Sequence, residues 1–261
     1  GITGHERRAI ELAMAANPDV ILFPGDLVQH AEPDAYAETQ DALGAVFREA
    51  GLAAPLGVYA VDGNVDLQRS WSRVFEGLDV KAVEGTVLDL GDDDFEEVPL
   101  EFSFPYQGDS WNSVFVNSNG NLTFGAGSTD FSESVAEFLN GPPRIAGVWD
   151  DLSPNNGGLI IVDSNSTSLS VSFVDVPEFI ATGANTFTFN LDASGDVTVS
   201  YGAISATDGL AGVTEGNGAA DPGPTDLSAA PSLSAAGTTY EQFGGGNPND
   251  LELEVLEYLS P

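Results

Sequence analysis

Residues 114–124 read VFVNSNGNLTF, and this stretch decides the fold of the larger part of the chain. Two apolar, β-prone segments flank a turn of asparagine, serine and glycine, which predicts a β-hairpin. Similar alternating segments recur at 169–173, 185–191 and 196–201, with turn residues between them. Residues 251–255 are expected to form a closing strand, and residues 216–234 a long surface connection. Many short strands separated by Gly, Asn and Asp turns predict an antiparallel β-sandwich and not a strand–helix–strand unit.

The first ninety residues follow a different pattern, in which helical and extended segments alternate. This order indicates a small parallel α/β layer. The expected helices are 6–16, 33–50 and 70–78, and the expected extended segments are 20–23, 56–61 and 83–90. The sequence therefore predicts a two-part α+β chain, with an α/β segment at 1–90 and a β-sandwich domain at 91–261.

The chain is strongly acidic, with 41 Asp and Glu residues against 7 Lys and Arg and a formal net charge of −34. Such a field repels nucleic acid and anionic lipid, so cations are the natural partners. Two explanations stay open: a solvated acidic coat, or Ca²⁺ sites built from clustered carboxylates. The chain has no cysteine for disulfides or thiolate metal sites. No apolar run is long enough to predict a membrane span.

Two motifs in the first part follow expected strands. Residues 17–29 read NPDVILFPGDLVQ, and residues 55–66 read PLGVYAVDGNVD. Over about residues 5–90 they resemble two metal-binding blocks of the calcineurin-like metallophosphoesterases, the second being that family's Gly-Asn-His-Asp block. By this resemblance Asp26 would bridge two metal ions, and Asn64 would bind one of them.

The same segment departs from that family where catalysis depends on it. The opening Asp-x-His block is absent, and Val65 occupies the position of the histidine that assists phosphoester cleavage. The chain contains only His5 and His30, so the family's later histidine ligands have no counterpart. A two-metal site needs several nitrogen and oxygen ligands around an open position. The segment is therefore interpreted as a truncated, degenerate phosphoesterase-like layer with Asp26 and Asn64 as vestigial ligands.

A second resemblance covers about residues 95–261. It rests on NSNGNLTFG at 117–125, PPRIA at 142–146 and VWDDL at 148–152. Together these motifs resemble the nidogen-like (NIDO-type) extracellular domain of bacterial surface proteins. The resemblance implies a secreted or cell-surface module of adhesive or matrix proteins, with no assigned catalysis.

Asp150 and Asp151 follow Trp149 and begin a tight polar loop. One possibility is that their side chains accept backbone N–H bonds within this loop. The other is that they form a calcium site together with neighbouring carbonyl groups. A second acidic run, residues 92–97, lies at the expected junction of the two parts, where a cation could fix their angle, although such runs are usually solvated.

The sequence is therefore interpreted as a non-catalytic extracellular or cell-surface structural or adhesive protein. It would associate with itself, into a larger assembly or filament, or with other matrix components, because a partial parallel layer leaves a sheet edge to cover. The alternative is a metal-dependent phosphoesterase with an accessory β-sandwich binding module. No motif requires a cofactor, and calcium is the cation that the carboxylates favour. No histidine follows His30, so the β part cannot form a Ser-His-Asp triad.

Overall fold

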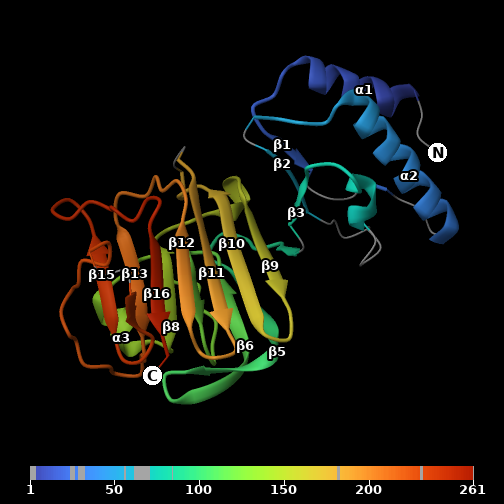
Figure 1. Cartoon of the computed structure of the whole chain (residues 1–261). Coiled ribbons are helices and arrows are strands. Elements are labelled where there is room, and N and C mark those ends of the chain that lie inside the picture. The colour runs from blue at the N-terminus through green and yellow to red at the C-terminus, as the bar shows by residue number, and fades with distance from the viewer. Residues whose placement is uncertain are drawn as a thin grey trace. The chain divides into compact units, whose positions relative to one another are not determined.

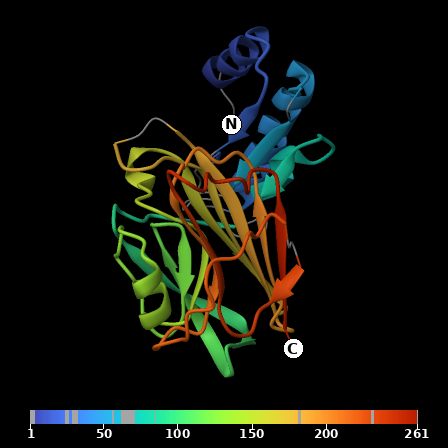
Figure 2. The ribbon, with the colours of Figure 1, turned by 90° about the vertical axis from the view of Figure 1, so that its left-hand side faces the viewer.

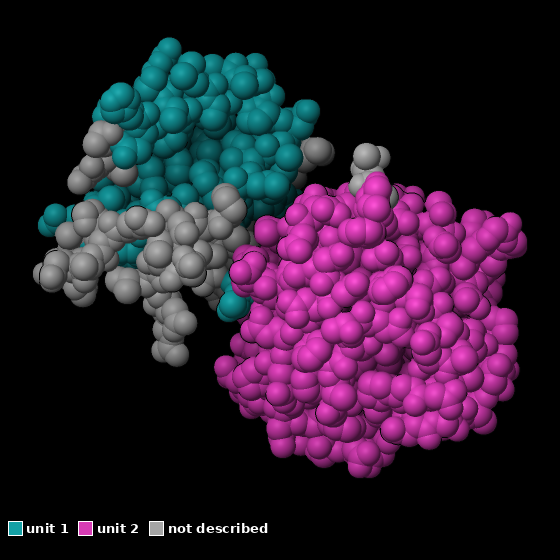
Figure 3. Space-filling model, turned by 180° about the vertical axis from the view of Figure 1, so that it is seen from behind, with its two compact units in different colours: residues 1–86 teal, residues 87–261 magenta. Residues whose placement is uncertain are grey.

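The computed structural model describes residues 4–23, 27–28, 33–55, 57–61, 71–83, 85–180, 183–229 and 232–260. The chain divides into two compact units, residues 1–86 and 87–261 (Figures 1 and 3). The predicted boundary lay at 90–91. Strand β4 spans Thr86–Leu88 and already belongs to a sheet of unit 2.

Unit 1 holds two α-helices, a 3-10 helix and a three-stranded sheet among its described residues. The strand order is β1-β2-β3, and both neighbouring pairs are parallel. The elements are α1 (Gly4–Ala15), β1 (Ile21–Phe23), α2 (Pro33–Ala50), β2 (Val58–Val61), η1 (Trp71–Phe75) and β3 (Lys81–Val83). A 3-10 helix thus occurs where a third α-helix was expected. Whether this sheet is a remnant of a metallophosphoesterase stays a prediction.

The core of unit 1 is built around three phenylalanine rings. The Phe23 ring of β1 lies 5.1 Å from that of Phe47 and 5.2 Å from that of Phe75, and Phe47 and Phe75 are stacked. Leu43 and Phe47, one helical turn apart on α2, are both buried. Apolar residues at this spacing form one face of a helix. The rings therefore join β1, α2 and η1 in a small core.

Unit 2 consists mostly of two large antiparallel sheets. One has the order β14-β16-β12-β11-β10-β9-β4, and the other has the order β15-β13-β8-β7-β6-β5. Figures 1 and 2 show them as two layers in a sandwich-like arrangement. Strand β14 is parallel to β16. The remaining elements are β5 (Phe95–Tyr106), β6 (Asp109–Asn117), β7 (Asn121–Thr123), α3 (Val135–Asn140), β8 (Arg144–Trp149), η2 (Pro154–Asn156), β9 (Leu159–Ser164), β10 (Ser168–Val176), β11 (Asn185–Asp192), β12 (Val197–Tyr201), β13 (Gly209–Thr214), β14 (Ser232–Ser234), β15 (Thr239–Phe243) and β16 (Val255–Leu259).

The core of unit 2 follows the alternation of the sequence. In β11, Phe187 and Phe189 are buried, whereas the residues between and beside them are more exposed. Phe173 of β10 stacks on Phe187 with the ring centroids 4.7 Å apart. Leu122 and Ile145 of the other sheet belong to the same buried cluster. Side chains from both sheets therefore share one hydrophobic core, as two packed layers require.

The predicted hairpin at 117–121 is confirmed. Strands β6 and β7 are joined by a three-residue turn, and Asn117 lies opposite Asn121. The Asn117 side-chain amide donates to Oδ1 of Asn121 at 2.8 Å. Gly120 has φ +75°, and a Cβ there would lie 1.8 Å from the carbonyl oxygen of Val148. The turn is therefore packed directly against β8, at the point where β8 leads into the Trp149–Leu152 segment.

The C-terminal strand begins later than predicted. Residues 251–255 were expected to be extended, but the strand is β16, Val255–Leu259. Leu253 has φ +67° and is exposed, whereas Leu256 and Tyr258 are buried. Apolar and acidic residues alternate over 251–255, but Val255 and Leu256 are consecutive apolar residues, and the buried positions 256 and 258 are out of step with the earlier alternation. The connection predicted at 216–234 ends in a short strand, β14.

Candidate metal centre

The Trp149–Leu152 segment continues from β8 into a loop that is held in place on several sides. The Trp149 ring is buried, and its Nε1 donates to the Asp130 carbonyl at 3.0 Å. The Arg144 guanidinium lies over that ring, 3.7 Å from the centroid. The amide of Leu152 donates to Oδ1 of Asn119, in the β6–β7 turn, at 3.1 Å. Asp150 and Asp151 therefore project from a well-anchored backbone.

Asp150, Glu178 and Asp208 form what we call the inner carboxylate group. One carboxylate oxygen of each lies within 4.8 Å of the others. Asp150 follows β8, Glu178 follows β10, and Asp208 precedes β13. At such a separation two like charges repel by roughly 3 kcal/mol if the effective dielectric constant is about 20. The fold therefore gathers three acidic groups, from both sheets, that repel one another when ionised.

Backbone contacts fix the positions of these carboxylates. Leu152 and Glu178 form an isolated antiparallel bridge, and the amide of Phe179 donates to the Asp151 carbonyl at 2.7 Å. A Cβ at Gly209 would lie 3.0 Å from the Trp149 carbonyl oxygen, so the Asp208–Gly209 backbone lies close against the end of β8. Backbone contacts between neighbouring strands and loops therefore bring the three residues of the inner group together.

Asp150 is the most buried member of the inner group, with 7% of its surface exposed. Its Oδ1 accepts the amide of Asp151 at 2.8 Å, whereas the buried Oδ2 has no hydrogen-bond partner among the described residues. Burial, reinforced by the charges of Glu133, Glu178 and Asp208, raises the pKa of Asp150 to about 7. Burial, followed by the charge of Asp208, also raises the pKa of Glu178. Both shifts reflect the cost of keeping ionised carboxylates close together and away from water.

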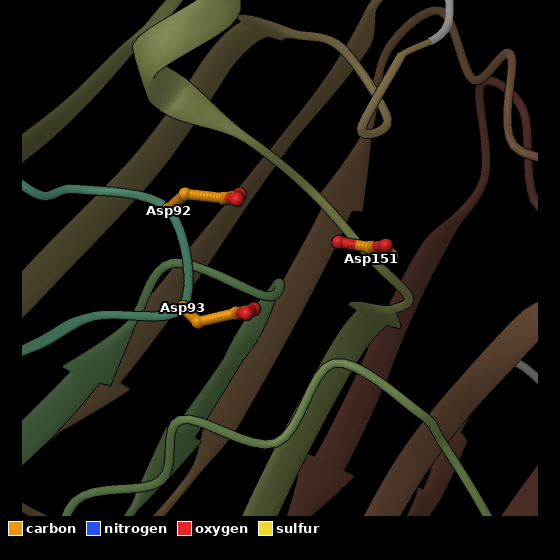
Figure 4. Close-up of side chains that lie close together, drawn as sticks. All are labelled: Asp92, Asp93 and Asp151. Carbon is orange, nitrogen blue, oxygen red and sulfur yellow. The ribbon is translucent and has the colours of Figure 1, made fainter.

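Asp92, Asp93 and Asp151 form an outer carboxylate group, with one oxygen of each within 4.8 Å of the others. Figure 4 shows Asp92 and Asp93, from the β4–β5 loop, extending toward Asp151. The side-chain amide of Asn119 donates to Oδ1 of Asp93 at 2.9 Å. Burial, followed by the charge of Asp93, raises the pKa of Asp151. All three carboxylate residues remain partly exposed.

The structure divides the predicted Asp150–Asp151 pair between these two groups. Asp150 belongs to the inner group and Asp151 to the outer one. The other interpretation of the pair was that its side chains accept backbone N–H bonds. Oδ1 of Asp150 does so, because it accepts the amide of Asp151. Within the predicted run at 92–97, Asp94 has a local role, since its two oxygens accept the amides of Gly91 and Phe95. Each acidic stretch thus contains both structural and candidate ligand residues.

Two members of the inner group, Glu178 and Asp208, were missed by the sequence analysis. Each is a single acidic residue among the 41 in the chain, without an acidic neighbour in the sequence. The vestigial ligands Asp26 and Asn64 lie outside the described residues, as does His30.

The donors in both groups are carboxylate oxygens, and unit 2 contains neither histidine nor cysteine. Such a donor set suits Ca²⁺ or Mg²⁺ better than Zn²⁺ or copper. Arg144 is the only basic residue in unit 2, and burial lowers its pKa to about 10. Its guanidinium covers Trp149, as described above. Unit 2 therefore supplies little positive charge to offset the carboxylates around the Trp149–Leu152 loop.

One comparison with known proteins identifies a family. The sequence model of the family described as NIDO related matches residues 70–242. This range contains all six residues of the inner and outer carboxylate groups. Neither a curated protein nor a solved structure matches the chain. Among the described residues, no helix combines the length and apolar character needed to cross a membrane.

Proposed function

The chain belongs to the NIDO-related family, and we propose from this membership that it is a nidogen-like protein of the cell surface or the extracellular space. Within that setting we propose a non-catalytic structural or adhesive role. The observation that carries the proposal is the family match over residues 70–242, which covers most of the two-sheet unit. The strong negative charge suits a module exposed to a salt-containing medium.

Three of the four edge strands of the two described sheets favour a discrete module. Strand β5 ends one sheet and carries Pro99, Pro105 and the exposed Glu101. Proline and charge on an edge strand hinder pairing with another chain. The edge strands of the other sheet, β4 and β14, are only three residues long. We therefore expect adhesion through loops and side chains and not through added strands.

Location is tested by labelling intact cells of the encoding organism with antibodies against unit 2. The expected result is a signal on intact cells close to that obtained after lysis, and removal of the signal by protease added outside the cells. A signal that appears only after lysis would contradict the proposed location.

Self-association is a finer part of the same proposal. Exposed apolar residues next to the candidate metal centre, Phe179 and Ile180, are candidate contacts between copies. Self-association can be tested by sedimentation velocity at protein concentrations of about 10–100 μM. Weak complexes form to a measurable extent in this range. We expect the sedimentation coefficient to rise with protein concentration, and to rise less for the Phe179→Ser variant. A constant monomer value across the range would remove self-association and leave adhesion to other molecules.

The alternative, a metal-dependent phosphoesterase, rests on two motifs in unit 1. The predicted ligands Asp26 and Asn64 follow β1 and β2 in the sequence, and these strands are parallel neighbours. Metal content of chelator-free protein and hydrolysis of bis-p-nitrophenyl phosphate with Mn²⁺ decide between the two functions. Bound metal and turnover, both lost in Asp26→Ala, would favour the enzyme. Absence of both would leave the structural role.

A further inference from the structure

We infer that Asp150, Glu178 and Asp208 form a binding site for a divalent cation, and that this cation is Ca²⁺. The inference concerns chemistry and does not depend on where the protein acts. Three carboxylate oxygens from separate segments lie within 4.8 Å of one another. Clusters of acidic residues are common on proteins, so proximity is only the first step.

Asp150 carries a buried carboxylate oxygen that lacks a hydrogen-bond partner within the described part of the chain. This side chain is 7% exposed, and its buried Oδ2 accepts no hydrogen bond from any described residue. Buried carboxylate oxygens are normally hydrogen-bonded, and burying an unpaired charge is costly. A cation coordinated by the group would supply the missing partner. It would also neutralise the repulsion among the three carboxylates.

The donor atoms favour calcium over other metals. Oxygen-only ligands are typical of Ca²⁺ and Mg²⁺, and transition metals prefer nitrogen or sulfur donors, which histidine and cysteine would supply. Mg²⁺ demands near-ideal octahedral geometry and tends to retain its waters, whereas Ca²⁺ accepts irregular and bidentate carboxylates. Asp150, Glu178 and Asp208 come from three chain segments at the ends of β8, β10 and β13. Such a dispersed set fits calcium better.

Calcium bound there would connect the two sheets. Asp150 and Asp208 adjoin strands of the six-stranded sheet, and Glu178 follows β10 of the seven-stranded sheet. The cation would hold the loop after β10 against the end of β8. Ca²⁺ should therefore stabilise unit 2 as well as bind to it.

The outer group supplies an internal comparison. Asp92, Asp93 and Asp151 are equally close to one another, and Oδ1 of Asp92 is also buried without a hydrogen-bond partner among the described residues, but all three side chains are partly exposed and none is as buried as Asp150. We assign the primary site to the inner group alone. A variant of the outer group should consequently leave most of the binding intact.

Isothermal titration calorimetry of the full chain, freed of metal by chelator and kept at constant ionic strength, tests the inference. Titration with CaCl₂ should show a saturable site with a dissociation constant between about 1 μM and 1 mM, the range of sensor and extracellular sites. MgCl₂ should bind at least about tenfold more weakly. Thermal unfolding followed in parallel should shift upward with CaCl₂ but not with KCl of equal ionic strength.

Two variants remove ligands without opening the core. Asp208→Asn changes an exposed residue and Glu178→Gln a partly buried one. Each should weaken calcium binding about tenfold or more, because a charged ligand is lost. Asp163→Asn and Glu101→Gln are matched controls, since both residues are exposed and lie in strands outside the two carboxylate groups. The controls and Asp93→Asn should bind calcium within about twofold of the parent, because surface charges far from a site are screened by salt.

Three results would overturn the inference. The first is no calcium heat and no thermal shift up to about 10 mM, beyond the range of extracellular sites. The second is an equal thermal shift with KCl, which would indicate general screening. The third is loss of binding in Asp93→Asn with retention in both Asp208→Asn and Glu178→Gln. Circular dichroism of each variant establishes that it is folded before its binding is compared.

Discussion

Gly120 shows how one residue decides the join between the β6–β7 turn and β8. It combines φ +75° with a backbone approach that leaves no room for a Cβ. A non-glycine residue in this conformation costs about 1–2 kcal/mol, and overpacking adds about 1–3 kcal/mol. We therefore predict that Gly120→Ala lowers the free energy of unfolding by about 3 kcal/mol, measured by urea denaturation.

Gly108 provides the control, because it has φ +83° in the β5–β6 turn but nothing within 4 Å of an added Cβ. Gly108→Ala should cost only the conformational part, about 1 kcal/mol. Equal losses in the two variants would show that the close contact with Val148 does not contribute.

Asp196 gives the fold a dependence on pH at its C-terminal end. Its Oδ1 accepts the amide of Ser260 at 2.8 Å, and Oδ2 accepts the Ser194 hydroxyl at 2.8 Å. The Ser260 amide and then the Ser194 hydroxyl lower the pKa of Asp196. A lowered folded-state pKa contributes stability above the unfolded value, about 4, and this stability is lost as the pH falls through the folded value.

Asp196→Asn keeps an acceptor for Ser260 but removes the charge. Because the side chain is partly exposed to solvent, we expect a loss of less than about 1 kcal/mol at pH 7. The difference between parent and variant should shrink as the pH falls below the unfolded value of about 4 and toward the lowered folded-state pKa of Asp196. Urea denaturation at pH 7 and pH 3 measures it, and a difference that stays constant with pH would contradict the electrostatic explanation.

Local patterns in the sequence predicted the strands better than they predicted the site. The 117–121 hairpin and helix α2 were located because turn chemistry and helical spacing are local signals. The group of Asp150, Glu178 and Asp208 depends on pairing between distant strands, in which Leu210 lies opposite Trp149. Register of this kind is set by cross-strand packing, which the sequence of one strand does not contain. Only the Trp149-Asp150-Asp151 motif gave a local signal for the site.

A hydrogen bond between sheets offers a prediction at the same scale. Tyr201 of β12 is buried, and its hydroxyl donates to the Gly147 carbonyl of β8 at 3.1 Å. Tyr201→Phe keeps the ring and removes this link, so we expect a loss of about 1–2 kcal/mol in unfolding free energy. Tyr240→Phe is the comparison, because the Tyr240 hydroxyl donates to the loop residue Asp221 within reach of solvent. A smaller loss for Tyr201→Phe than for Tyr240→Phe would contradict a role in joining the sheets.

The chain contains two separate hydrophobic cores, one in each unit, and this separation determines how we expect it to unfold. Val74 belongs to the cluster of unit 1 and Val171 to that of unit 2, and both are fully buried. Each is expected to stabilise its own unit, and both carboxylate groups lie in unit 2. We therefore predict two transitions in differential scanning calorimetry of the full chain. Calcium should raise only the transition of unit 2.

The size of that shift follows from linkage between binding and folding. At a calcium concentration about one hundred times the dissociation constant, binding stabilises the folded state by about 2.7 kcal/mol. For a domain of this size each kcal/mol moves the midpoint by about 2–4 °C, so a shift on the order of 5–10 °C is expected. Val171→Ala should lower the calcium-sensitive transition, and Val74→Ala the other one. A single transition lowered equally by both substitutions would mean that the two units unfold together, and calcium would then stabilise the chain as a whole.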